Sequence, residues 1–179
     1  MRYQTRICAF IWVLTASPTF AVTDEATGLS INPPEPFIAT LVDDPNTTAT
    51  ISIEPNSNAI TEDDSDHVVC KAGFREETSN AFLTQDEIND LVVQPEVIES
   101  TTGGLRTAFD LDGPLIFSVG GVTGLEFTGV ALSDFTPVYF VSMQTPSGVT
   151  NMMCFNALEH FPQSLPHFRA IRDAISPPP

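Results

Sequence analysis

The feature that most constrains the fold of this chain is a pair of cysteines, Cys70 and Cys154, that lie far apart in the sequence. Each sits in an apolar, strand-like segment, over residues 67–74 and 151–155. The third cysteine, Cys8, lies in an N-terminal segment that we expect to be removed. An even pair in an exported chain predicts a structural disulfide, so the two segments should be neighbours in space. Two free thiols or part of a metal site are the alternatives, although two sulfurs without a nearby histidine pair do not complete a zinc site.

Residues 1–21 have the parts of a secretory signal peptide. Arg2 and Arg6 precede an apolar run over residues 7–16, and small residues allow cleavage after Ala21. The run is too short to span a bilayer. The alternative, a buried N-terminal helix, would need a polar face that this segment lacks. We therefore expect a periplasmic or secreted protein with no integral membrane segment after cleavage.

The charge of the chain limits its partners. The formal net charge is −16, and loss of the signal peptide, with its two arginines and no acidic residue, would make the protein more acidic still. Such a surface repels phosphate backbones and anionic lipid head groups, which argues against nucleic-acid binding. Basic proteins, cations and neutral small molecules remain possible partners; alternatively, the charge serves only to keep the protein soluble.

One helix is predicted from its first residues. Thr84 and Glu87 have the spacing of a capping box, in which each side chain bonds the backbone N–H of the other residue. The pattern predicts a helix over residues 85–93 that is stopped by Pro95. Its buried residues should be Ile88, Leu91 and Val92.

Most of the remaining chain has the pattern of strands and turns. Gly103 and Gly104 are expected to lie in a turn, as are the residue pairs 112–113 and 120–121, and residues 145–148 predict a β-hairpin. A last helix is predicted by helical spacing, with Arg169 and Arg172 placed to favour the C-terminal end of its dipole. The predicted strands cover residues 28–32, 37–42, 48–54, 67–74, 106–111, 115–119, 125–132, 138–144 and 149–156, and the helical set is Phe161, Leu165, Phe168, Ile171 and Ile175.

The order of these elements predicts an α+β fold. Connections between the late strands are too short for parallel crossovers. We expect residues 22–176 to form a single domain, in which a largely antiparallel sheet carries a central capped helix and a C-terminal helix packed on it. Residues 177–179 would be a proline tail.

Three stretches carry a resemblance to the Mog1/PsbP-like α/β/α sandwich families, many of whose members are exported bacterial proteins. Residues 28–33 resemble the first strand of those families, residues 138–156 the last two strands, and residues 161–175 the closing helix. The resemblance implies the sandwich fold. These families share no catalytic motif, and known members mostly bind other proteins, so it also implies a role in binding.

The densest group of polar side chains is an acidic segment with one histidine. Calcium prefers six to eight oxygen ligands, and this segment offers several, but its spacing does not match an EF-hand loop. A solvated acidic loop is the alternative. The candidate metal ligands are Glu62, Asp63, Asp64, Asp66 and His67.

The sequence supplies no recognisable catalytic motif. It has no G-x-S-x-G and no H-E-x-x-H pattern, and its three histidines, His67, His160 and His167, are scattered. We assign no catalytic residue and no cofactor. The leading hypothesis is a non-enzymatic binding or accessory module that contacts another envelope or extracellular protein. A calcium-responsive module is the alternative, and a small hydrolase is a third hypothesis.

A thermal melt with and without millimolar calcium tests the acidic segment. If it is a solvated loop, we expect the melting midpoint to stay unchanged. Binding to the native state alone must raise the midpoint, so a higher midpoint in calcium, reversed by a chelator, would instead support the calcium-responsive module.

Overall fold

The computed structural model describes residues 21–56 and 69–179. The predicted signal peptide therefore lies outside the described residues except for Ala21, and the predicted metal ligands at residues 62–67 lie outside them entirely.

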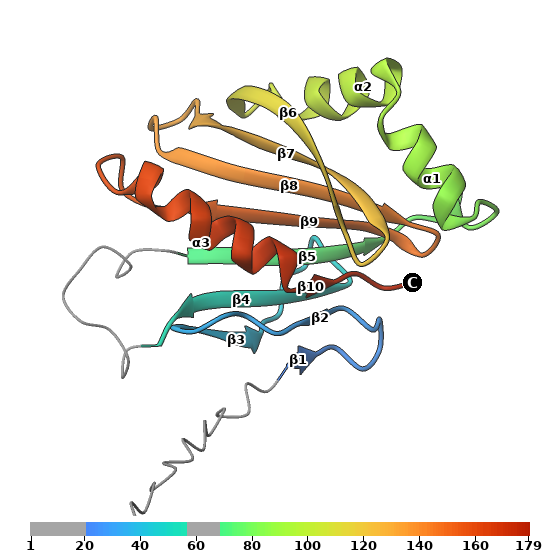
Figure 1. Ribbon diagram of the computed structural model, residues 1–179, viewed down its shortest axis with the longest axis horizontal. Helices are drawn as coiled ribbons and strands as arrows, with labels where there is room; N and C mark the ends of the chain where they lie inside the picture. Colours follow the sequence, from blue (N-terminus) through green and yellow to red (C-terminus); the bar gives the residue numbers. More distant parts are fainter. Residues whose placement is uncertain (1–20, 57–68) are drawn as a thin grey trace, which may run out of the picture.

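A seven-stranded antiparallel sheet forms the centre of the structure, with the strand order β3-β4-β5-β9-β8-β7-β6 (Figure 1). Neighbours in this order are consecutive in the chain everywhere except at β5 and β9. The strands are β3 (Phe37–Leu41), β4 (Ala49–Pro55), β5 (Val69–Glu76), β6 (Phe109–Val119), β7 (Val122–Ala131), β8 (Pro137–Thr145) and β9 (Gly148–Phe155).

Helices and a small sheet cover the two faces of this sheet. The helices are α1 (Gln85–Val92), α2 (Pro95–Leu105) and α3 (Phe161–Asp173), with a short 3-10 helix, η1 (Thr78–Asn80), before α1. The small sheet joins β1 (Val22–Thr23), β2 (Ser30–Ile31) and β10 (Ile175–Ser176). The predicted α+β class, with a largely antiparallel sheet, is confirmed.

Two hydrophobic cores lie on opposite faces of the sheet. The larger one packs α3 and the small sheet against residues that alternate along β4, β5, β8 and β9, among them the predicted pair Ile51 and Ile53. The smaller core packs α1 and α2 against β7 and β8 through Leu125, Phe127 and Phe140. This alternation is the period-two pattern expected of strands buried on both faces.

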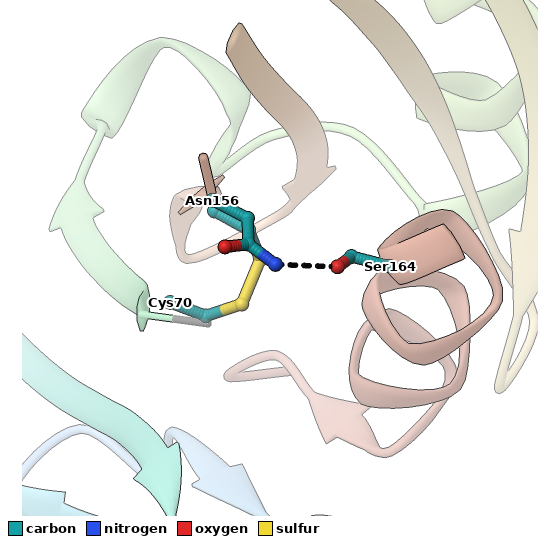
Figure 2. Close-up of a disulfide and its surroundings, with 4 residues drawn as sticks. Cys70, Asn156 and Ser164 are labelled. Carbon is teal, nitrogen blue, oxygen red and sulfur yellow. Dashed lines mark hydrogen bonds between the residues drawn. A yellow bond between two sulfur atoms is a disulfide. The ribbon is translucent and has the colours of Figure 1, made fainter. Parts of the chain in front are cut away.

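The β5–β9 junction carries the predicted disulfide. Cys70 and Cys154 are directly opposite each other in the register, their Cα atoms are 4.1 Å apart, and the disulfide joins them. Beside it, the Asn156 side-chain amide donates a hydrogen bond of 2.7 Å to the Ser164 hydroxyl on α3 (Figure 2). Ser164 in turn donates to the carbonyl oxygen of His160. A hydrogen bond thus also connects the β5–β9 junction to the first turn of α3.

The capped helix forms as predicted, but the segment after it was assigned wrongly. Both hydrogen bonds of the Thr84 capping box are present, whereas Leu91 is 43% exposed rather than buried. Pro95 ends α1 and also begins α2, since proline has no N–H to lose at the first helical position. Gly103 therefore lies inside a helix and not in a turn, and so does Gly104.

Two further boundaries differ from the sequence pattern. Residues 112–113 do not form a turn, because β6 continues through them with a register shift between Asp112 and Leu115. Ile175 is not helical: α3 ends at Asp173, and Ile175 pairs with Ile31 in the small sheet. In both places a tertiary pairing overrides the local pattern.

Alanine substitutions at two glycines, one in a strand and one in a helix, test the assignment of these elements. A Cβ at Gly129 in β7 would lie 2.1 Å from the carbonyl oxygen of Asp110, while a Cβ at Gly103 would meet nothing within 4 Å. We expect Gly129→Ala to lower the free energy of unfolding by about 1–3 kcal/mol through overpacking. Gly103→Ala should raise it by roughly 0.5–1 kcal/mol, since alanine favours a helix. Urea unfolding followed by circular dichroism measures both, and a destabilising Gly103→Ala would contradict the helix α2.

Candidate functional site

Among the residues that the structure describes, no helix packs on half of one face of the large sheet. The helices α1 and α2 pack against β6, β7 and β8, and no described helix packs on the same face of β3, β4, β5 and β9. We call this half the open face. Its side chains are Ile38 and Thr40 on β3, Thr50, Ser52 and Glu54 on β4, Val69, Lys71 and Arg75 on β5, and Asn151, Met153 and Phe155 on β9. Thr50 and Ser52 are buried within this face.

The open face contains a shallow hollow of about 270 Å³. Thr47, from the turn between β3 and β4, forms part of its wall and lies over Gly73, where a Cβ would come within 2.9 Å of the threonine methyl carbon. Phe140, on the border with the smaller core, contributes another part of the wall. The remaining lining residues are Asp44, Asn46, Thr50, Lys71, Arg75, Asn151, Met153 and Phe155.

Two exposed basic side chains lie in this hollow. Lys71 and Arg75 project from the same face of β5, four residues apart. Asn151 is opposite Gly73, the residue midway between them, and Met153 is opposite Lys71. The hollow therefore combines two cations, an amide, hydroxyls and partly buried apolar side chains.

The opposite face of the sheet holds a buried ionic cluster around Glu126, which is 2% exposed. Its Oε1 accepts hydrogen bonds from Arg169 Nε at 2.9 Å and Nη2 at 2.7 Å. Its Oε2 accepts one from the Tyr139 hydroxyl at 3.0 Å and another from Arg172 Nη1. The carboxylate of β7 is thus bonded to β8 and to two successive turns of α3.

The surroundings of Arg172 complete this cluster. Its guanidinium carbon lies 4.3 Å from the centroid of the Phe117 ring, in a cation–π contact, and its Nη2 is 2.7 Å from Asp173 Oδ1. Burial raises the pKa of Tyr139 above its ordinary value, so the neutral hydroxyl persists as a hydrogen-bond donor. The hydrogen bonds to Glu126 raise the pKa of Arg169. Glu126 is enclosed, and its bonds to both arginines orient α3 on the sheet.

Of the three histidines singled out in the sequence, His160 and His167 lie in the described part of the chain. His167 is exposed on α3 and lies edge-on to Phe37, with ring centroids 5.8 Å apart, while His160 directly precedes α3. Arg169 and Arg172 bond Glu126, and Arg172 also lies in the last turn of α3, as the dipole assignment predicted. Within residues 21–56 and 69–179, no group of three or more His, Cys, Asp or Glu side chains is placed to hold a metal ion.

The sequence pattern missed both the Glu126 cluster and the open face. A signal for the cluster was present, since Glu126 is a lone acid between Leu125 and Phe127 in an apolar strand, and the last helix has two arginines three residues apart. Lys71 and Arg75 alternate with buried residues, which places them on one face of a strand. The local sequence does not reveal that no helix covers that face.

Comparisons with known proteins identify the fold. No family model matches the chain, and no curated protein sequence matches it. Among solved structures, it is similar to the cyanobacterial PsbP of Synechocystis, at 9% identity and a TM-score of 0.51, over 91% of this chain and 95% of that one. It is also similar to LpqN, a Mycobacterium tuberculosis protein involved in cell envelope biogenesis, at 14% identity and a TM-score of 0.54, over 89% and 90% of the two chains. The fold is that of the Mog1/PsbP-like sandwich, as the resemblance implied.

None of the helices in the described parts of the chain is both long enough and apolar enough to cross a membrane.

Substitutions in the ionic cluster measure its contribution to the free energy of unfolding. Glu126→Leu leaves two arginines facing a buried position without their anion. Arg169 is 43% exposed and can turn toward water, but Arg172 is 12% exposed and cannot. We expect a loss of about 3–5 kcal/mol in the free energy of unfolding. Tyr139→Phe removes a single hydrogen bond and should cost about 1 kcal/mol. Equal losses in urea unfolding of the two variants would contradict the central role of Glu126.

Proposed function

We propose that this chain is an exported, non-enzymatic accessory protein that acts by contact between its open face and another envelope or extracellular protein. The observation that carries the proposal is that, among the described residues, no helix packs on one half of a sheet face, whereas α1 and α2 pack on the other half. A sheet face with both apolar and polar side chains accessible is a surface on which a second protein can pack.

The composition of the open face supports a contact of this kind. Its exposed apolar residues include Ile38, at 47% exposure, and Val69, at 40%. Met153 and Phe155 are partly buried beside them, and Lys71, Arg75 and Asn151 supply polar groups. The register places Val69 beside Phe155 at one end of this face, and Lys71 and Asn151 further along it. A surface that offers both apolar and hydrogen-bonding groups is typical of a protein interface.

The disulfide and the N-terminal pattern support the proposed compartment. Disulfides persist in oxidising surroundings such as the periplasm and the extracellular space, and the Cys70–Cys154 bond is present. The first 21 residues have the pattern of a cleavable signal. Export as a soluble, disulfide-bonded protein accounts for both features.

The structural comparisons support the accessory role by analogy of fold. LpqN is involved in cell envelope biogenesis. The same fold in an exported chain is compatible with an accessory role, although a fold by itself does not determine a function.

Site-specific photo-crosslinking in the natural host tests the proposal. A photoreactive amino acid replaces Asn151, which is exposed on the open face, and in a matched control it replaces Gln163, which is exposed on α3. If the open face is the interface, we expect an adduct of one defined mass from position 151 and none from position 163.

The outcomes of this experiment are distinct. An adduct of twice the mass of the chain would make a second copy the partner. Equal crosslinking from both positions, or none from position 151, would overturn the proposed interface.

A further inference from the structure

The charges of the open face differ from those of the rest of the protein. The formal net charge is −16, so almost any cation in this chain has a carboxylate available as a partner. Five of the seven basic residues lie in the described parts of the chain: Lys71, Arg75, Arg106, Arg169 and Arg172.

Three of these five residues form ion pairs. Arg106 lies 3.5 Å from Glu99, and Arg169 and Arg172 bond Glu126. No carboxylate among the described residues forms an ion pair with Lys71 or Arg75. Both unpaired cations therefore lie in one hollow on the open face.

The one carboxylate in the hollow has other partners. Asp44 accepts hydrogen bonds from the backbone N–H of Asn46 at 2.9 Å and from its side-chain amide at 3.1 Å. These bonds hold Asp44 in the turn between β3 and β4. With respect to the carboxylates of residues 21–56 and 69–179, Lys71 and Arg75 thus remain available to an anion that comes from outside.

The spacing of the two cations defines the shape of such an anion. Four residues of β-strand separate Lys71 and Arg75 by roughly 13 Å along β5. An extended segment with carboxylates four residues apart has the same spacing. The residue midway between those carboxylates points in the same direction, toward Asn151 and the apolar group of Phe140, Met153 and Phe155.

We infer that the open face binds an extended acidic segment of the partner protein, with two carboxylates four residues apart and an apolar side chain midway between them. This inference rests on the proposed function and adds the chemistry of the partner. The chain as a whole is strongly acidic, so its net charge repels the same segment, whereas in the hollow both carboxylates of the segment meet cations. The attraction is screened over about 8 Å at physiological ionic strength, so binding weakens as salt is added.

A synthetic peptide tests the inference directly. The probe is acetyl-Thr-Glu-Thr-Phe-Thr-Glu-Thr-amide, and the control peptide has glutamine in place of both glutamates. Titration into the isotopically labelled protein, followed by amide chemical shifts, should move the signals of Gly73 and Asn151 with the first peptide and leave them unmoved with the second.

Charge-neutral variants locate the contact. We expect Lys71→Gln combined with Arg75→Gln to weaken binding of the glutamate peptide by about tenfold, since two exposed ion pairs are lost. The control is Arg106→Gln, which changes the net charge in the same direction at the residue after α2 and should leave the affinity unchanged. If the double variant does not fold, Lys71→Gln alone and a salt titration of the unaltered protein give the same comparison.

Several results would overturn the acidic segment as partner: equal binding of the two peptides, equal affinity of the double variant, or a higher affinity for a peptide with lysine in place of glutamate. These results leave the proposed function standing if position 151 still crosslinks to one partner. Loss of that crosslink with peptide binding intact would instead overturn the proposed function while the site remained.

Discussion

The pairing of β5 with β9 is the contact on which the rest of the structure depends. Strands β3, β4 and β5 follow one another in the chain, as do β6, β7, β8 and β9, so each group can pair through local connections. Joining the two groups requires β5 to meet β9 across the whole intervening segment. The Cys70–Cys154 disulfide lies at this junction, and in the chain-entropy view a link over so long a loop stabilises the fold by about 4–5 kcal/mol.

The position of the last helix follows from that junction. Asn156 leaves β9 beside the disulfide and bonds Ser164, which holds the first turn of α3. Further along the helix, Arg169 and Arg172 reach Glu126 on β7. A buried ion pair adds little net stability compared with apolar packing, but the paired hydrogen bonds admit only one orientation of the helix. With α3 on one face and α1 and α2 over part of the other, the open face is what remains.

Several features that depend on residues close together in the sequence were predicted correctly, whereas several that depend on distant residues were not. The Thr84 capping box, the alternation of Ile51 and Ile53 and the turn before Gly148 depend on residues within a few positions of one another, and these predictions are confirmed. Pro95 was interpreted as the end of a helix because nothing nearby indicates that it also begins one. Ile175 continues the helical spacing, but pairing with Ile31 moves it into a strand.

The sequence by itself determined the cysteine pair, the acidic charge, the helices α1 and α3 and most of the strands, since composition and short-range patterns encode them. Cys70 and Cys154 are the two cysteines that remain outside the predicted signal peptide. They form the predicted disulfide. Only the tertiary structure decided that these strands are direct neighbours, that Glu126 is buried against two arginines, and that Lys71 and Arg75 share an uncovered face. The physical reason is that packing between distant segments decides which face of the sheet each helix covers. No local sequence pattern predicts that packing.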